Sequence, residues 1–416
     1  MNMQWAWGMP ALLALLCAGN AFAGEAVYPI VGTGQTKCYD SRREIAPPRL
    51  GEAFYGQDAQ HQANRPSYRD NGDGTISDLV TGLMWVKARG VKVTFADAAA
   101  GVAACRVGGH ADWRMPTIKE LYSLINFNGG FHRTAAESTP YLDVKCFGFA
   151  YGDEAKGERP IDCQDWSATE YVGTTMQGNA TVFGVNFADG RIKGYPKNMR
   201  RREGVAANML YVRYVRGNPD YGRNDFRDNG DGTITDRATG LMWAKADSGK
   251  GMDWEAALAW VQARNKENYL GHNDWRLPDA KELQSIVDYA RAPAASEPAR
   301  RSAALGPAFA VTRLAAGDYP WFWSSTTHLD GPPDRQGNAA IYVAFGRALG
   351  WMQFPPGRGE YHLVDVHGAG AQRSDPKVGN AADYPHGRGP QGDVIRIENF
   401  VRCVRDAAPA ADAGKP

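Results

Sequence analysis

Few of the side chains that carry catalysis or bind metals lie close together in this sequence. Asp365 and His367 are two residues apart, so on a strand they would project from the same face, as two ligands of a metal ion do. Asp375, Asp383 and His386 follow, but no firm ligand spacing completes the set, and a loop held by side-chain hydrogen bonds is the alternative. The sequence has no G-x-S-x-G, H-E-x-x-H or P-loop motif. It therefore predicts no catalytic residue and no cofactor, and leaves Asp365 and His367 as candidate metal ligands.

The acidic segment 70–76, DNGDGTI, resembles the beginning of a calcium-binding EF-hand loop. When Asp73 is placed at the fifth loop position, Arg69 falls at the first and Val80 at the twelfth, where an EF-hand needs carboxylates. A tight hairpin turn around Asn71-Gly72 is therefore the interpretation that we favour.

Two other sets of side chains are suited to binding by charge or by stacking. The first is a basic run formed by Lys193, Lys197, Arg200, Arg201 and Arg202. Such a run suits a polyanion such as a sulfated polysaccharide or lipopolysaccharide, and a solvated loop is the alternative. The second set is Trp321 and Trp351, which could stack on sugar rings if they are exposed, with burial in the core as the alternative.

The N-terminus predicts an exported protein. Residues 11–17 (ALLALLC) are apolar but too few to span a bilayer, and Ala21-Phe22-Ala23 has the pattern of a signal-peptide cleavage site. We expect a signal peptide over 1–23 and a mature chain in the periplasm, on the cell surface or secreted. No later apolar run predicts a transmembrane segment. The 47 basic and 46 acidic residues among 416 nearly balance, so the composition predicts no nucleic-acid partner.

Five cysteines remain after removal of the signal peptide, and in an oxidising compartment most of them should pair. Cys146 and Cys163 are close in sequence and flank a charged loop, so we predict a local disulfide between them. Cys38, Cys105 and Cys403 compete for one more bridge.

The chain contains an internal duplication. Residues 70–88 and 228–246 share 15 of 19 positions, and later segments recur in the same order. Two copies are too few for a solenoid, so we expect a tandem pair of domains. In chain order the sequence predicts a leader segment over 24–67, a first domain over 68–216, a linker over 217–225, a second domain over 226–405 with an insert near 352–398, and a disordered tail over 406–416.

Each repeat carries the same predicted order of elements. After the DNGDGT hairpin, apolar residues at i, i+3, i+4 and i+7 predict a helix over 95–102. A second short helix follows the DWR segment, where Thr117 and Glu120 have capping-box spacing. Short strands such as 181–187 complete the repeat. Two helices per domain beside short hairpins and long loops predict an α+β fold.

Together these pieces resemble the bacterial family named after the C-terminal domain of the Legionella collagen-like adhesin (Lcl). The family pattern joins a DNGDGT hairpin, TGLMW, DWRLP with a Lys-Glu-Leu helix, WSST and a closing VRCVR. The first repeat carries its versions at 70–75, 81–85, 112–121, 166–169 and 212–216, and the second repeat closes at 401–405. The resemblance implies an exported protein with C-type-lectin-like, formylglycine-generating-enzyme-like domains, and for the namesake it implies adhesion through glycosaminoglycans.

The resemblance also bears on the cysteines. Family members often hold one cysteine in the first helix and one in the closing segment. Here the first repeat keeps Cys105 but closes with Tyr214, whereas the second keeps Cys403 and has Ala263 or Arg264 at the helix position. A Cys105–Cys403 bridge between the domains is one alternative that follows, with the leader cysteine as a competing partner.

Three functions follow as hypotheses. The first is a non-enzymatic binding or adhesion protein for a glycan or a polyanionic surface ligand. The second is a structural or assembly component of a cell-surface machine. The third is an enzyme of the formylglycine-generating type. That chemistry resembles a reaction of a copper-bound cysteine pair, and the sequence holds no matching pair, so we disfavour it.

Overall fold

The computed structural model describes residues 26–61, 64–201, 204–315, 317–332, 335–355 and 357–407. The predicted signal peptide and all but the first two residues of the predicted tail lie outside these ranges. Residues Ala26–Ala407 form one unit, which contains both repeats. Within the described part of the chain, no helix is long and apolar enough to cross a membrane.

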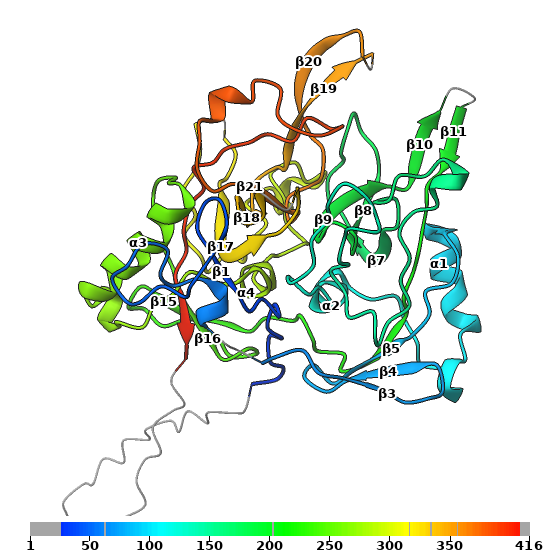
Figure 1. Cartoon of the computed structure of the whole chain (residues 1–416), viewed down its shortest axis with the longest axis horizontal. Coiled ribbons are helices and arrows are strands. Elements are labelled where there is room, and N and C mark those ends of the chain that lie inside the picture. Colours follow the sequence, from blue (N-terminus) through cyan, green and yellow to red (C-terminus); the bar gives the residue numbers. More distant parts are fainter. Residues whose placement is uncertain are drawn as a thin grey trace, which may run out of the picture. The chain divides into compact units, whose positions relative to one another are not determined.

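Each repeat opens with a four-stranded antiparallel sheet that its own last strand completes (Figure 1). In the first repeat the order is β13-β5-β4-β3, and in the second it is β22-β16-β15-β14. The bounds are β3 (Tyr68–Asp70), β4 (Thr75–Asp78), β5 (Leu83–Val86), β13 (Val215–Gly217), β14 (Phe226–Asp228), β15 (Thr233–Asp236), β16 (Leu241–Ala244) and β22 (Val404–Asp406). The predicted hairpins and the tandem repeat are therefore confirmed.

The DNGDGT segment is a hairpin turn held by its own polar side chains. The Asn71 amide donates to the hydroxyls of Thr75 and Ser77 at 2.8 and 2.9 Å. Asp73 Oδ1 accepts from the backbone N–H and the hydroxyl of Thr75 at 2.9 and 2.6 Å. The second repeat has the same bonds at the same distances. These oxygens stabilise the turn, as the hairpin interpretation predicts.

Two α-helices per repeat begin where the capping signals predict. They are α1 (Phe95–Gly101), α2 (Ile118–Ser123), α3 (Trp254–Lys266) and α4 (Ala280–Ser285). Thr117 and Asp279 each form a capping box with the glutamate three residues later. Arg114 of the first DWR segment pairs with Glu120, so this arginine supports the helix start. Short 3-10 helices are η1 (Asp58–Gln60), η2 (Val102–Ala104), η3 (Val107–Gly109), η4 (Glu154–Lys156), η5 (Tyr269–Gly271), η6 (Pro298–Arg300) and η8 (Ala381–Asp383).

The residues that recur in both repeats are mostly core. The recurring tryptophans are all buried and are Trp85, Trp113, Trp166, Trp243, Trp275 and Trp323. The closing arginines are buried as well: Arg213 donates to three backbone carbonyls of the first repeat, and Arg402 does the same in the second. These arginines satisfy loop carbonyls that would otherwise be buried without a donor.

The two repeats share one six-stranded sheet with the order β17-β18-β21-β9-β8-β7. Its strands are β7 (Asp165–Glu170), β8 (Thr181–Asn186) and β9 (Arg191–Pro196) from the first repeat, and β17 (Trp321–His328), β18 (Ala339–Ala344) and β21 (Gln372–Pro376) from the second. The junction is the antiparallel pair β9–β21, in which Ile192 lies opposite Gln372. One hydrophobic core contains residues of both repeats. The architecture is α+β with more strand than helix.

Short hairpins extend from this framework. Two of them, β10 (Asn198–Arg201) with β11 (Gly204–Ala207) and β19 (Leu349–Phe354) with β20 (Glu360–Asp365), project from the shared sheet (Figure 1). The second of these belongs to the insert expected near 352–398. The remaining pairs are β1 (Cys38–Tyr39) with β2 (Glu44–Ile45), and β6 (Val93–Thr94) with β12 (Met209–Leu210).

A reciprocal pair of lysines joins α2 to α4. Lys119 at the start of α2 donates from Nζ to the carbonyl of Ser285, at the end of α4, at 2.6 Å. Lys281, its twin on α4, donates to the carbonyl of Ser123, at the end of α2, at 2.7 Å. The Lys-Glu-Leu motif therefore crosses between the repeats, and each ammonium lies where a helix C-terminus favours a cation.

The predicted disulfides are not formed. All five cysteines of the described residues are free. Cys163 is buried with Sγ 3.8 Å from Asn186 Oδ1, whereas Cys146 packs against the shared core, so the predicted Cys146–Cys163 bridge is wrong. The Cys105–Cys403 bridge is absent too, because Cys403 lies inside the core of the second repeat.

Candidate binding site at the junction of the repeats

A charged cleft of about 520 Å³ lies where the two repeats meet. Its walls come from β9 and the residues before it, and from β18, β21 and the loops that flank them. The cationic lining residues are Arg159, Arg191, Lys193, Arg335, Arg373 and Arg388, and the acidic ones are Asp189, Asp330, Asp375 and Asp393. The lining therefore carries a formal charge of about +2 when its carboxylates are ionised.

Strand alternation directs the β9 side chains into the cleft. Arg191, Lys193 and Tyr195 are partly exposed, whereas Ile192 and Gly194 between them are buried. Successive side chains of a strand point to opposite faces, so the three polar residues share the face that lines the cleft. Pairing of β9 with β21 adds residues of the second repeat to the same surface.

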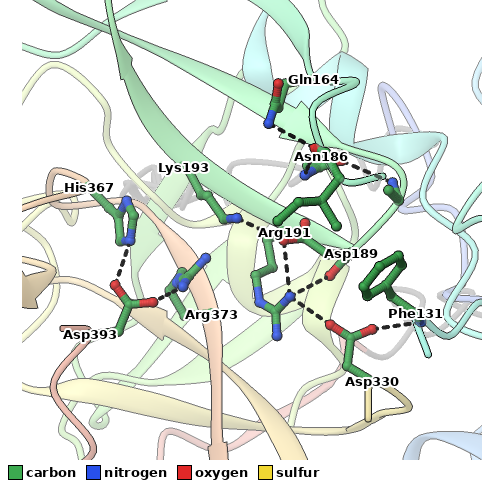
Figure 2. Close-up of polar contacts among 12 residues, drawn as sticks. Phe131, Gln164, Asn186, Asp189, Arg191, Lys193, Asp330, His367, Arg373 and Asp393 are labelled. Carbon is green, nitrogen blue, oxygen red and sulfur yellow. Dashed lines mark hydrogen bonds and ion pairs between the residues drawn. The ribbon is translucent and has the colours of Figure 1, made fainter. Parts of the chain in front are cut away.

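Asp189 and Asp330 hold the β9 cations in place (Figure 2). Arg191 Nη1 lies 2.6 Å from Asp330 Oδ2 and 3.1 Å from Asp189 Oδ2. Lys193 Nζ lies 2.7 Å from the same Asp189 oxygen. Asp330 belongs to the second repeat, so its pair with Arg191 also joins the repeats. Asp189 Oδ1 is buried and has no hydrogen-bond partner among the described residues.

Arg373 is the cation of the second repeat in this cleft. Its Nη2 contacts Asp393 Oδ2, and Asp393 Oδ1 lies 2.8 Å from His367 Nε2 (Figure 2). Arg373 Nε and Nη1 are buried and have no hydrogen-bond partner in the described part of the chain, and the Tyr195 hydroxyl is in the same state. A buried guanidinium N–H without an acceptor is costly, so these donors would gain from an acceptor brought by a ligand.

The closely spaced cations of the cleft shift the pKa values of one another and of Asp189. Burial raises the pKa of Asp189, but Lys193, Arg191 and Arg373 outweigh burial and hold it well below its usual range. Burial lowers the pKa of Lys193 to about 8, with Asp189 opposing and the two arginines adding to the shift. Burial, followed by the charge of Arg191, lowers the pKa of Arg373 to about 10. An anion in the cleft would relieve this repulsion.

The described side chains of the predicted basic run, Lys193 and Lys197, lie in different surroundings. Lys193 lines the junction cleft, whereas Lys197 pairs with Glu170 at 2.8 Å and lies over the Phe95 ring. Arg200 and Arg201 belong to strand β10, and Arg202 lies outside the described residues. Of the two side chains of the run that the structure describes, Lys193 lines the cleft and Lys197 does not.

The two candidate stacking tryptophans differ in environment. Trp321 is only 1% exposed, its ring is stacked on Tyr342 at 4.7 Å, and the Arg396 guanidinium lies over it at 3.8 Å. It is therefore a core residue, which was the alternative interpretation. Trp351 is partly exposed on β19, next to the ring of His386.

Asp365 and His367 do not converge on a common point. Asp365 accepts from the Tyr171 hydroxyl at 2.7 Å and from the Gly368 N–H at 2.8 Å. His367 faces Asp393, and burial lowers its pKa well below the usual range. Among the described residues, no group of three or more His, Cys, Asp or Glu side chains could hold a metal ion. Hydrogen bonds engage the Asp365 carboxylate and His367 Nε2, whereas His367 Nδ1 is buried without a partner among the described residues.

Sequence reasoning missed most of the cleft. Asp189, Arg191, Asp330, Arg373 and Asp393 come from distant segments that only the shared sheet brings together. One local signal was present, because Arg191, Lys193 and Tyr195 alternate with smaller or apolar residues as on a strand with one polar face.

Comparison with known proteins identifies the repeats. The family model described as the Lcl C-terminal domain matches residues 74–216 and again residues 232–366. No curated protein and no solved structure matches the chain. The second match ends before Arg373 and Asp393, so part of the cleft lies outside the matched residues. The two matches span well over half of the sequence, and the chain belongs to the Lcl C-terminal domain family as a tandem member.

Proposed function

We propose that this protein is exported and binds an anionic carbohydrate in the junction cleft, without catalysis. The observation that carries the proposal is Arg373, whose Nε and Nη1 donors are buried without partners among the described residues, between cations of both repeats. A planar guanidinium with free N–H groups suits a carboxylate or a sulfate. Membership of an adhesin-derived family supports a surface adhesin-like role.

The acids of the cleft favour a sugar over a simple inorganic anion. Asp189 Oδ1 and Asp375 Oδ1 are buried acceptors without partners among the described residues. Sugar hydroxyls donate to carboxylates, whereas an inorganic anion such as sulfate or chloride brings only acceptors. A glycan that carries both hydroxyls and a carboxylate or sulfate would donate to the unpaired carboxylate oxygens and accept from the unpaired guanidinium N–H groups.

The test is binding of the mature chain to heparin-derived hexasaccharide, oligogalacturonate and neutral maltohexaose, measured by calorimetry. We expect at least one acidic oligosaccharide to bind and the neutral one not to bind. Arg373→Gln and Lys193→Gln should each weaken binding about tenfold, which corresponds to about 1.4 kcal/mol. Lys245→Gln is the matched control, because Lys245 is an exposed lysine paired with Asp228 in the turn of the second repeat.

Preference for the neutral sugar, or unchanged affinity in both cleft variants while they retain the wild-type melting temperature, would overturn the proposal. The two variants complement each other, because Arg373→Gln leaves Asp393 without its guanidinium, whereas Lys193→Gln leaves Asp189 paired with Arg191.

We extend the proposal to a C-type-lectin-like architecture for domains over 68–216 and 226–405. The family resemblance and the matching order of sheets and helices in the two repeats support it. Superposition of an experimental structure of the chain on C-type lectin domains tests it.

A role as an assembly component of a cell-surface machine is the second candidate. One feature favours it specifically: in the described part of the chain, nothing covers a face of the first repeat as the leader covers the equivalent face of the second.

A further inference from the structure

The leader packs against the second repeat through a buried carboxylate. Asp58 Oδ2 accepts from the hydroxyl of Thr326 at 2.5 Å and from that of Thr33, a leader residue, at 2.8 Å. Asp58 and Thr326 are both buried. Thr326 Oγ1 also accepts from the backbone N–H of Ala280 at 3.0 Å, so this hydroxyl links the leader to α4.

A buried lysine makes the second contact of the leader. Lys377 Nζ donates to the carbonyl of Asp40 at 3.0 Å and to the hydroxyl of Thr327 at 2.9 Å, and it lies 3.9 Å from the centre of the Trp254 ring. Thr326, Thr327, Lys377 and Trp254 therefore form the leader-binding face of the second repeat.

The first repeat has an equivalent face, which the described residues of the leader do not cover. The duplication places Thr169, Glu170, Lys197 and Phe95 at the positions of Thr326, Thr327, Lys377 and Trp254, respectively. Thr169 Oγ1 accepts from the Ile118 N–H at 3.0 Å, the same distance as in the second repeat. Lys197 Nζ lies 4.7 Å from the centre of the Phe95 ring. We call these four residues the open face.

Exposure shows that, among the described residues, no counterpart of the leader covers the open face. Ala168 and Glu170 are exposed, whereas their twins Ser325 and Thr327 are 1% and 0% exposed. The Lys197 side chain is 28% exposed, whereas Lys377 is fully buried. In the described part of the chain, Thr169 has no carboxylate where Thr326 has Asp58.

The cavities beside the two faces differ in the same way. The cavity next to Asp58 is lined by Tyr68, Leu124 and several leader residues, and it holds about 220 Å³. The cavity next to Thr169 is lined by their twins Phe226 and Ile286 and holds about 640 Å³. The larger space lies where the duplication would place a second leader.

The residues fix the chemistry of an occupant. A carboxylate would accept from Thr169 as Asp58 does from Thr326, and backbone carbonyls would accept from Lys197 as those of the leader do from Lys377. The second repeat also places the Asp279 carboxylate at the start of α4, where its charge opposes that of Asp58. The first repeat has the uncharged Thr117 at that position, and the carboxylate on the open face is instead Glu170, which pairs with Lys197.

We propose that the open face of the first repeat binds an extended peptide segment of a partner protein, which places an aspartate or glutamate side chain against Thr169 and its backbone carbonyls against Lys197. This docking site is separate from the junction cleft, and it does not depend on carbohydrate binding. It gives the assembly hypothesis a specific surface.

The probe is a synthetic peptide of the leader itself, residues 30–61, added to the intact mature protein. Glu170 pairs with Lys197, whereas its twin Thr327 leaves Lys377 free to donate to the leader as well. Glu170→Thr should therefore tighten peptide binding about tenfold. Ala168→Glu should weaken peptide binding about tenfold. Glu360→Thr is the matched control, because Glu360 is also an exposed strand glutamate. An Asp58→Asn peptide should bind about tenfold more weakly.

Hydrogen exchange locates the peptide. We expect protection of residues 114–120 and 165–170 when the peptide binds. No binding at about 1 mM peptide to the wild type or to Glu170→Thr would overturn the proposal. Protection of 321–328 instead would overturn it as well, because the peptide would then be replacing the resident leader. Neither result bears on binding of acidic sugars to the cleft.

Discussion

Replacement of Lys281 by methionine tests the reciprocal lysine contact between the repeats. Lys281 is buried, and its ammonium donates to the carbonyl of Ser123 at 2.7 Å and to that of Gly32 in the leader at 2.9 Å. Methionine has a similar length and is apolar, so Lys281→Met removes the two hydrogen bonds while filling most of the space.

The magnitude follows from two opposing contributions. Two hydrogen bonds from a charged donor contribute about 3–6 kcal/mol together. Burial opposes them, because it lowers the pKa of Lys281 from 10.5 to about 8, which corresponds to about 3.4 kcal/mol at neutral pH. We therefore expect Lys281→Met to lower the free energy of unfolding by about 0–3 kcal/mol at pH 7.

The pH dependence is the sharper test. Between pH 8 and 10.5 the folded protein has lost the Lys281 proton while the unfolded chain still holds it, so wild-type stability rises with pH in this window. The rise is about 1.4 kcal/mol between pH 7 and pH 9. Lys281→Met lacks this contribution, so its deficit in urea unfolding should be larger at pH 9 than at pH 7.

Two other lysine variants serve for comparison in this experiment. Lys119→Met should show the same trend, because burial lowers the pKa of Lys119 to about 8 as well. Lys245→Met, at an exposed lysine, should change stability by less than about 0.5 kcal/mol at either pH. A Lys281→Met variant whose deficit is the same at both pH values would refute the reasoning.

Three further predictions follow from individual contacts. Affinity for an acidic oligosaccharide should fall as pH rises above about 8, because Lys193 then loses its charge, and calorimetry at pH 7 and pH 9 should show no such fall in Lys193→Gln. Tyr214→Cys should form a disulfide with Cys105, because the Tyr214 hydroxyl donates to the Ala98 carbonyl of α1, and Cys105 follows α1 and η2 directly in the chain. The bridge would close a loop of roughly 110 residues and raise stability by up to about 4–5 kcal/mol, and peptide mapping that finds a free Cys105 thiol would contradict this. Iodide should quench the fluorescence of Trp351→Phe protein less than that of Trp321→Phe protein, because of these two tryptophans Trp351 is partly exposed and Trp321 is buried.

Local patterns in the sequence predicted local structure well. The Asn71-Gly72 turn, the capping box of Thr117 and the buried tryptophans each depend on neighbouring residues or on hydrophobicity alone, and all are confirmed. The duplication was equally visible, because it needs only the comparison of one segment with another.

The junction could not be predicted in the same way. Ile192 pairs with Gln372 across 180 residues, and no turn signal or periodicity specifies such a partner. The cleft forms because of that pairing. Asp330 and Arg373 therefore could not be recognised as site residues before the sheet was known. The Cys146–Cys163 prediction failed for a related reason: closeness in sequence does not bring two side chains into the geometry that a disulfide needs.

The most direct test of the central claim is a map of amide protection in the mature protein with and without a bound acidic oligosaccharide. The account predicts protection of residues 189–195 in the first repeat together with residues 372–376 and 388–395 in the second, because the cleft is built from both. Protection confined to the basic hairpin over 197–207, or to one repeat alone, would contradict the assignment of the junction cleft as the binding site.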